Sequence, residues 1–202
     1  MAALRLGVLG GTFDPPHYGH LMLAEHAREQ LGLEQVLWVP AGDPWRKAGG
    51  AVTSGEHRLA MLRLAVAGNN AFEISTAELD RPGPSYTVET LAELREQLPA
   101  HELVFLLGAD ALQDLPDWHD APRILELALL GATARGGERP SDAALDALLP
   151  GLSGRVVWFE MPRVDISATD IRRRAAEGQS LRDLVPPAVE AYIRQHKLYR
   201  SS

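Results

Sequence analysis

Residues 4–20 read LRLGVLGGTFDPPHYGH, and this stretch determines how the rest of the chain can be folded. Its first part, residues 4–9, is mostly apolar and predicts a buried strand, which Gly10 and Gly11 close. From residue 18 to residue 31 apolar side chains recur at helical spacing, and Gly32 stands where such a helix would end. A strand, a glycine turn and a helix therefore open the chain.

The same alternation continues outward from this stretch. Further strands are predicted at residues 35–39, 72–75, 102–107, 130–134 and 155–159, and helices at residues 56–67, 86–97, 123–129, 143–149, 169–177 and 187–196. Strands that are apolar on both faces and alternate with helices are typical of a parallel sheet covered on two sides. We therefore expect an α/β fold, a Rossmann-like doubly wound parallel sheet with helices on both faces. Residues 1–202 are expected to form a single domain, with a helical segment from about residue 167.

The composition restricts the class of protein. Hydrophobic residues make up 46% and charged residues 23% of the 202 residues, and there is no cysteine for a disulfide or a thiolate metal site. Twenty Lys and Arg against 27 Asp and Glu give a net charge of −7, which argues against nucleic-acid binding. No apolar run approaches the roughly 20 residues that cross a bilayer, and the strand starting at Leu4 leaves no room for a signal peptide. We expect a cytoplasmic protein without membrane contact; assembly into a homo-oligomer is left open.

In a doubly wound sheet, ligands bind beyond the carboxyl ends of the strands, at the switch point. His17 and His20 follow the first strand and share one face of the first helical turn, while Gly19 between them leaves space. Free N–H groups at the helix start favour phosphate, and we expect the two rings, as an imidazolium pair, to donate to phosphate oxygens. The glycine spacing fits neither G-x-x-x-x-G-K-[ST] nor G-x-G-x-x-G, and two histidines without the Glu of H-E-x-x-H make a poor zinc site. Each histidine taken alone could simply face solvent.

A second candidate segment, ISATDIR, covers residues 166–172. Ser167, with Asp170 three residues later, is a variant of the capping box and could merely start a helix. The same hydroxyl and N–H groups at a helix start also suit a phosphate, and Arg172 would add a fork of donors. The segment is therefore either a simple helix start or half of a phosphate site.

Residues 11–20 carry every position of the G-[ST]-F-D-P-x-H-x-G-H signature and resemble the nucleotidyltransferase superfamily, which couples ATP or CTP to a phosphorylated acceptor. Residues 166–172 match the I-S-x-T-x-I-R motif of the same superfamily. The resemblance implies a fold of the nucleotidyltransferase type and an ATP site built from both segments. It assigns ATP binding to Gly10, Gly11, Thr12, Phe13, His17, Gly19, His20, Ile166, Ser167, Thr169 and Arg172.

Within the superfamily, nearly the whole chain resembles the bacterial nicotinate-nucleotide adenylyltransferases, which act on ATP and nicotinate mononucleotide to make deamido-NAD. The P-S-Y-T segment of that family corresponds to residues 84–87. The resemblance implies that Ser85, Tyr86 and Thr87 bind the acceptor, with the backbone around Tyr86 and Thr87 and the Thr87 hydroxyl receiving the nicotinate carboxylate. The G-A-D stretch and the following tryptophan of the family match Gly108, Asp110 and Trp118. These three residues would complete the acceptor site: the carboxylate would accept ribose hydroxyls, and the indole would stack on the pyridine ring. Trp118 read alone is more simply a core or surface residue.

The loop after the second strand departs from the family pattern. Lys47 falls at the lysine expected to contact phosphates, but Trp45 and Arg46 replace the usual Pro-His pair, which puts the loop's contacts in doubt. The resemblance implies that His17, His20, Lys47 and Arg172 supply the catalytic positive field. Mg²⁺ would arrive with ATP, held mostly by phosphates and water rather than by protein ligands.

Three alternatives stay open. The acceptor could be nicotinamide mononucleotide, alone or with dual specificity, because both pyridines could stack on Trp118. Phosphopantetheine is disfavoured, because those relatives are shorter and lack the P-S-Y-T and Trp segments. A non-catalytic nucleotide sensor would be expected to lose a signature histidine or the Ser/Thr/Arg motif, and both are present here.

Overall fold

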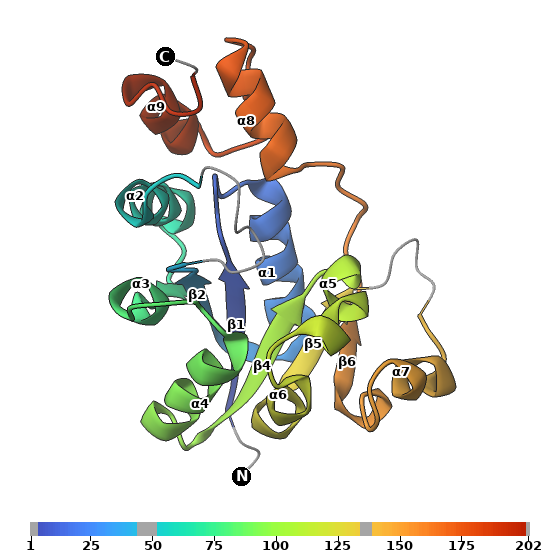
Figure 1. The fold of residues 1–202 in the computed structure, drawn as a ribbon. Coiled ribbons are helices and arrows are strands. Elements are labelled where there is room, and N and C mark those ends of the chain that lie inside the picture. Colours follow the sequence, from blue (N-terminus) through green and yellow to red (C-terminus); the bar gives the residue numbers. More distant parts are fainter. Residues whose placement is uncertain (1–3, 44–51, 134–138, 201–202) are drawn as a thin grey trace.

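The computed structural model describes residues 4–43, 52–133 and 139–200, with backbone alone at residues 109 and 110. Its centre is a six-stranded parallel sheet in the order β3-β2-β1-β4-β5-β6 (Figure 1). The strands are β1 (Leu4–Gly11), β2 (Leu33–Pro40), β3 (Phe72–Ile74), β4 (His101–Leu107), β5 (Leu129–Thr133) and β6 (Val156–Phe159). The predicted doubly wound parallel sheet is confirmed.

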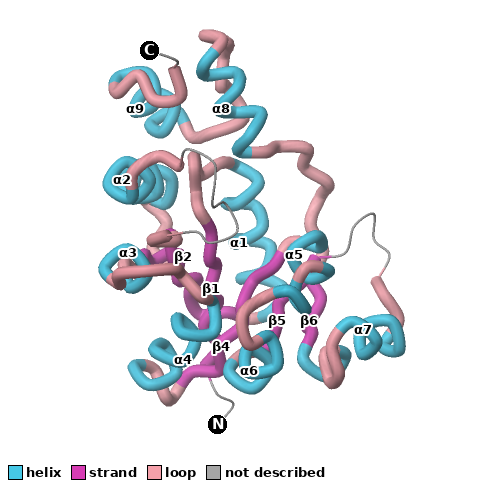
Figure 2. Tube along the Cα trace, viewed as in Figure 1, coloured by secondary structure: helices cyan, strands magenta, loops and turns pink. Residues whose placement is uncertain are grey.

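Helices cover both faces of this sheet, as Figure 2 shows. They are α1 (Tyr18–Leu31), α2 (Gly55–Val66), α3 (Ala77–Asp80), α4 (Thr87–Gln97), α5 (Ala109–Gln113), α6 (Ala121–Leu127), α7 (Asp142–Leu148), α8 (Ala168–Ala176) and α9 (Pro187–Gln195). Successive residues of β1 point to opposite faces, so Val8 joins the core under α4 and α6, whereas Leu9 joins the core under α1 and α2. This double burial explains the continuous apolar runs in the strands.

The order of the strands reverses at β1. From β1 the chain first builds β2 and β3 on one side and then crosses to β4, β5 and β6 on the other. Gly10 and Gly11 still pair with β2, at Val39 and Pro40, whereas the pairing with β4 already ends at Val8 and Phe105. The glycine turn therefore stands at the switch point, where ligands bind in folds of this kind.

Several boundaries differ from the sequence prediction. The short helices α3 and α5 were not predicted, because four or five residues are too few to show a helical period. Helix α6 begins two residues earlier than predicted, with Pro122 in its first turn, where the missing N–H of proline costs nothing. None of the helices that the structure describes is long and apolar enough to cross a membrane.

Helices α8 and α9 stand beyond the end of the sheet (Figure 1). They pack with α2 around a third apolar cluster that includes Met61, Ile171, Val189 and Ile193. The helical segment predicted from about residue 167 is thus present, and it is placed over the end of the sheet that carries the glycine turn.

Candidate active site

The turn from β1 into α1 is built around two histidine rings. His17 is the N-cap of α1, and its backbone N–H donates to Nδ1 of His20 at 3.3 Å. The two rings stack with centroids 3.7 Å apart and an interplanar angle of 22°, and Phe13 meets His20 edge-on at 5.1 Å. The structure therefore places the two histidines side by side on one face of the first helical turn, as the spacing predicts.

The sequence predicts a positive charge on both rings, and for His17 this prediction is wrong. Its side chain is only 7% exposed, and burial lowers its pKa to about 4, so the ring is neutral at pH 7. His17 Nδ1 is buried without a hydrogen-bond partner among the described residues. Nδ1 of His20 is the acceptor of the hydrogen bond from the His17 backbone, which leaves Nε2 to donate. His17 is thus a neutral ring stacked on His20 rather than an imidazolium ion.

The glycines of the turn serve this packing of rings. A Cβ at Gly19 would lie 3.1 Å from both Cε1 and Nδ1 of His17, and one at Gly11 would lie 3.0 Å from the ring of Phe13. Both distances are tighter than ordinary contacts, so a larger residue would displace a ring. Gly10 is exposed at the end of β1, where backbone can approach a ligand.

The second candidate segment lies against the first. Ser167 is the N-cap of α8, with its hydroxyl accepting from the Asp170 N–H at 3.2 Å. Arg172 Nη1 donates to the backbone carbonyl of Asp14 at 2.8 Å, and its Nη2 donates to the Thr169 hydroxyl at 3.3 Å. The Ile166 carbonyl lies 3.9 Å from the position of a Cβ on Gly19. Two motifs far apart in the sequence thus form one site.

Arg172 differs from its neighbours on α8 in its partners. Arg173 and Arg174 both form ion pairs with Asp170, at 2.6 Å each. Arg172 makes no ion pair with a carboxylate in the part of the chain that the structure describes, because its bonds go to a carbonyl and a hydroxyl. Its charge is therefore available to an anion.

Arg58, which the sequence analysis did not select, is a buried cation beneath the turn. It is 2% exposed and donates from three nitrogens to three backbone carbonyls: Thr53 at 2.9 Å, Thr12 at 2.9 Å and Gly42 at 3.2 Å. Burial lowers its pKa and the Asp14 carboxylate opposes this shift, and an arginine stays charged throughout. An arginine four residues before the buried Leu62 on a helix was the signal that could have revealed it.

Asp14, the acidic residue of the signature, is also buried. It is 3% exposed, with Oδ1 accepting from the Tyr199 hydroxyl at 2.7 Å and Oδ2 accepting from the Thr53 N–H at 3.2 Å. Both carboxylate oxygens are therefore bonded within the protein, and Asp14 holds the turn rather than offering a ligand to a metal.

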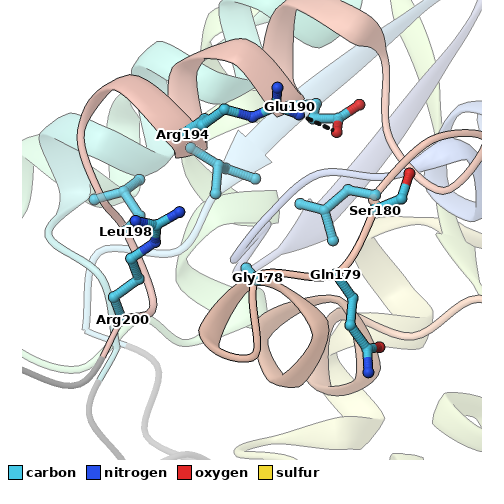
Figure 3. Close-up of a pocket in the computed structure, with 10 residues that line it drawn as sticks. Gly178, Gln179, Ser180, Glu190, Arg194, Leu198 and Arg200 are labelled. Atoms are coloured by element: carbon cyan, nitrogen blue, oxygen red, sulfur yellow. Dashed lines mark hydrogen bonds and ion pairs between the residues drawn. The ribbon is translucent and has the colours of Figure 1, made fainter.

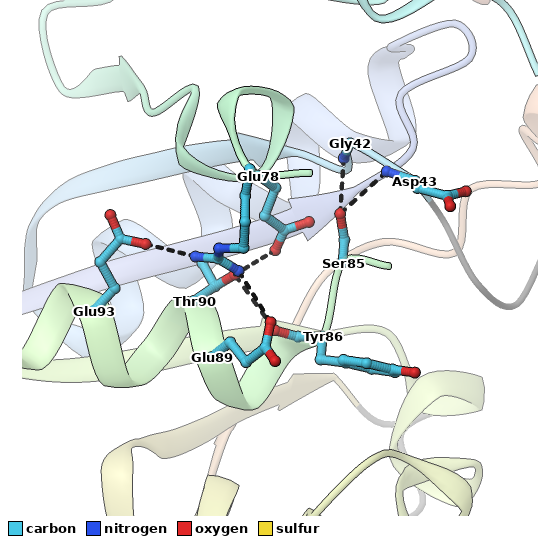
Figure 4. A network of polar contacts seen from close by, with 9 residues as sticks. Gly42, Asp43, Glu78, Ser85, Tyr86, Glu89, Thr90 and Glu93 are labelled. Atoms are coloured by element: carbon cyan, nitrogen blue, oxygen red, sulfur yellow. Dashed lines mark hydrogen bonds and ion pairs between the residues drawn. The ribbon is translucent and has the colours of Figure 1, made fainter. Parts of the chain in front are cut away.

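On the other side of β1, Ser85 ties two loops together (Figure 4). Its hydroxyl oxygen accepts from the N–H groups of Gly42 at 2.9 Å and Asp43 at 3.2 Å. Thr90 donates to the buried Glu78 at 2.7 Å, and the nearby Ser85 hydroxyl also favours the charged form of this carboxyl. Burial raises the pKa of Glu78, against the effect of these two hydroxyls. The Ser85 hydroxyl thus contacts the protein itself.

The other acceptor candidates gather near the ends of β4 and α4. Tyr86 is the N-cap of α4, Thr87 is its first residue, and Gly108 directly follows β4. Trp118 packs on the same core cluster as Tyr86 and meets Phe105 edge-on at 5.9 Å. Its Nε1 is buried without a hydrogen-bond partner among the described residues. The Tyr86 ring lies 4.3 Å from that of His119, an exposed residue that the sequence analysis did not consider.

Two candidates lie outside the description. Lys47 belongs to residues 44–51, which the structure does not describe, and the side chain of Asp110 is likewise outside it. Among the described residues there is no group of three or more histidine, aspartate or glutamate side chains that could hold a metal ion.

The sequence also matches known proteins of the family that its motifs resemble. Residues 8–174 match the family model described as cytidylyltransferase-like. A protein of Thermomicrobium roseum named "Probable nicotinate-nucleotide adenylyltransferase" is 50% identical over 197 residues, which cover 98% of this chain and 92% of that protein. A protein of Roseiflexus sp. with the same name is 50% identical over 200 residues, which cover 99% and 100%.

Solved structures agree in fold. Plasmodium falciparum nicotinic acid mononucleotide adenylyltransferase complexed with NaAD is similar to this chain with a TM-score of 0.78, covering 97% of both chains at 18% identity. The same Plasmodium enzyme complexed with APC gives a TM-score of 0.76 at the same identity and coverage. At this level of identity the likeness concerns the arrangement of helices and strands.

Proposed function

The chain belongs to the cytidylyltransferase-like family and, within it, to the nicotinate-nucleotide adenylyltransferases, and from this we propose that it transfers the adenylyl group of ATP to nicotinate mononucleotide. The products would be deamido-NAD and pyrophosphate, in a step of NAD biosynthesis. Because the proposed reaction uses ATP as the donor, we propose that the enzyme works in the cytoplasm.

One observation carries the ATP half of this proposal. The guanidinium of Arg172 reaches the Asp14 carbonyl at 2.8 Å, although the two residues are 158 positions apart. That bond places a cation without a carboxylate partner, within the described chain, next to the helix start that carries His17 and His20. A helix N-terminus, N–H donors and an arginine together suit a polyphosphate.

The reaction needs little covalent chemistry from the protein. An oxygen of the acceptor phosphate bonds to the α-phosphorus of ATP, and the bond from that phosphorus to the bridging oxygen breaks to release pyrophosphate. A nucleotide phosphate loses its second proton near pH 6, so the attacking oxygen is already charged and no general base is required. Catalysis then rests on positioning and on donors aimed at the oxygens where charge accumulates.

The roles in this scheme follow from the charge states. His17 donates as a neutral ring, His20 donates beside it, and the positive field comes from Arg172 and Lys47. Mg²⁺ would enter as part of the ATP–Mg²⁺ substrate, where it would neutralise charge on the phosphates. Gly10, Gly11, Thr12, Phe13, Gly19, Ile166, Ser167 and Thr169 complete the proposed ATP site.

For the acceptor we propose the ends of β4 and α4. Tyr86 and Thr87 present the N-terminal backbone of α4 to the nicotinate carboxylate, and Ser85 fixes that backbone through Gly42 and Asp43. Gly108 and Asp110 receive the ribose. Trp118 supplies the stacking surface for the pyridine ring.

The experiment is pyrophosphate release with ATP–Mg²⁺ and either nicotinate or nicotinamide mononucleotide, run side by side. We expect the acid to be strongly preferred, because an anion suits the helix start and an amide does not. Equal or reversed preference would keep the transferase and overturn the pyridine pocket, and no release with either would favour a nucleotide sensor. His20→Ala should lower kcat by about 10²–10³-fold in a folded protein, the loss typical of a removed transition-state donor.

A further inference from the structure

We propose that Tyr199, in the segment that follows α9, is a positioning residue for adenylyl transfer that acts through Asp14. The inference rests on the proposed function, and it adds a residue that no signature motif contains. Tyr199 is not itself placed against a substrate. It would set the geometry of the turn that carries His17 and His20 and of the guanidinium of Arg172.

The contact between the two side chains is short and buried at one end. The Tyr199 hydroxyl donates to Asp14 Oδ1 at 2.7 Å, and Asp14 is 3% exposed. Burial and the neighbouring Asp14 raise the pKa of Tyr199, so the phenol keeps its proton and remains a donor. The other carboxylate oxygen accepts a backbone N–H, from Thr53 at 3.2 Å. A hydrogen bond to a buried charge is stronger than one between neutral groups, so removing it should disturb the position of Asp14.

Asp14 contacts both parts of the ATP site, the turn that carries the histidines and the guanidinium of Arg172. Its carboxylate is held by Tyr199, while its backbone carbonyl accepts the bond from Arg172 at 2.8 Å. The residue before it, Phe13, has a left-handed backbone with φ of 49° and packs edge-on against His20. A shift of the Asp14 backbone, once its side chain is no longer held, would therefore disturb the arginine on one side and a histidine on the other.

The chain makes a costly turn to bring Tyr199 to this place. After α9, Lys197 and Tyr199 both adopt left-handed backbone, with φ of 51° and 67°, and the Leu198 N–H bonds back to the Ile193 carbonyl at 3.0 Å. Positive φ in non-glycine residues costs energy and persists where the surrounding structure enforces it. The neighbours Leu198 and Arg200 line a cavity of about 410 Å³ between α8 and α9, whereas Tyr199 does not (Figure 3).

The chain offers a matched control for the phenol. Tyr192 lies on α9 in the same apolar cluster, and its hydroxyl bonds to Nδ1 of His57 at 2.9 Å rather than to Asp14. Replacing either tyrosine by phenylalanine removes one oxygen that is bonded to a partner on another segment. A role limited to stability predicts that the two variants behave alike in catalysis.

The test compares Tyr199→Phe, Tyr192→Phe, Asp14→Asn and the double variant Y199F/D14N in the full-length protein, by kcat and by KM for ATP and nicotinate mononucleotide. We expect Tyr199→Phe to lower kcat on the order of 10- to 100-fold, the loss that small displacements in a reacting site produce, with KM for the acceptor within about twofold. Tyr192→Phe should stay within about twofold in kcat. In the D14N background, Tyr199→Phe should cost less than about threefold, because the charge it acts on is gone.

Two results would overturn the proposal: a kcat of Tyr199→Phe within twofold of wild type, or full additivity of the two substitutions. Thermal melting shows that each variant is folded at the assay temperature, and Asp14→Asn with Tyr192→Phe carries the test if Tyr199→Phe does not fold. Amide hydrogen exchange over residues 12–20 gives a readout without substrate and should accelerate in Tyr199→Phe but not in Tyr192→Phe. If wild type transfers no adenylyl group, the proposed function fails, while this exchange difference still decides whether Tyr199 positions the turn.

Discussion

Each half of the candidate site is held by a buried carboxyl group, but the two carboxyl groups have different surroundings. On the ATP side, Asp14 accepts from a phenol and a backbone N–H, and the buried guanidinium of Arg58 lies beneath the same turn. On the acceptor side, Glu78 accepts from the Thr90 hydroxyl, and its pKa is raised by burial. The first half places a buried cation beside its carboxylate, whereas the cation near Glu78, Arg81, is partly exposed and bonds to Thr90.

The difference has a physical logic. Under the proposed function, the ATP side would have to stay positive toward a polyphosphate, and a buried cation and anion that balance each other would leave Arg172 to act on the ligand. The acceptor side must present N–H groups to one carboxylate, and a fully charged glutamate close by would repel it. Each half is thus positioned by residues that we do not place against a substrate.

The largest effect is expected at Arg58. Arg58→Met removes the donors to three backbone carbonyls and the cation opposite Asp14, so we expect a loss of about 3–5 kcal/mol in the free energy of unfolding, as for one partner of a buried charge network. Urea unfolding at pH 7 measures it. Arg63→Met, at an exposed position of the same helix, is the control and should change stability by less than about 0.5 kcal/mol. A loss below 1 kcal/mol at Arg58 would contradict the idea of compensated charges.

A smaller effect concerns His17 and acid. Its pKa is about 4 in the folded protein against 6.5 for the ordinary side chain, so between these values the unfolded chain binds more protons. Its contribution is therefore present at neutral pH and is lost as the pH falls through this window, by about 2 kcal/mol between pH 7 and pH 5. Denaturant unfolding at both pH values, for wild type and His17→Gln, isolates this part from the other histidines. Equal acid losses in the two proteins would show that His17 is not buried as a neutral ring.

Much of the fold was readable from the sequence, because the signals were local. Helix α1 has the predicted bounds, since Gly32 ends it in a left-handed conformation with φ of 64°. The switch point followed from the order of strands and helices. The family resemblance is confirmed by relatives 50% identical over nearly the whole chain.

The rest of the site was not readable, because it depends on contacts between distant segments. Tyr199 bonds to Asp14 across 185 positions, so no local pattern marks it. The spacing of Arg58 on its helix hinted at burial, but its bonds to Thr12 and Gly42 could not be foreseen. The charge of His17 was mispredicted because burial decides its pKa, and burial of one side chain is a property of the packed structure. The role of Ser85 in holding the loop of Gly42 required the position of that loop.

The smallest effect is expected on the acceptor side, at Glu78. Its folded pKa is raised, so its contribution to stability is greatest below the ordinary value of 4.5 and falls as the pH rises through the folded value. Glu78→Gln keeps the shape and the acceptor oxygen for Thr90 without the charge. Its stability at pH 7 should therefore lie within about 1 kcal/mol of wild type, or above it.

The matched substitution Asp14→Asn tests whether the two halves differ in this way. It has the same chemistry as Glu78→Gln, but it removes a carboxylate that Arg58 compensates, so it should destabilise the protein by about 1–3 kcal/mol. Urea unfolding of both variants from pH 5 to pH 8 is the measurement. If both amides destabilise equally at every pH, the two carboxyl groups play the same part. The other outcome is that only Asp14→Asn lowers the free energy of unfolding, while the difference in this energy between wild type and Glu78→Gln shrinks as the pH rises. In that case the charge of Asp14 stabilises the fold, and the charge of Glu78 destabilises it.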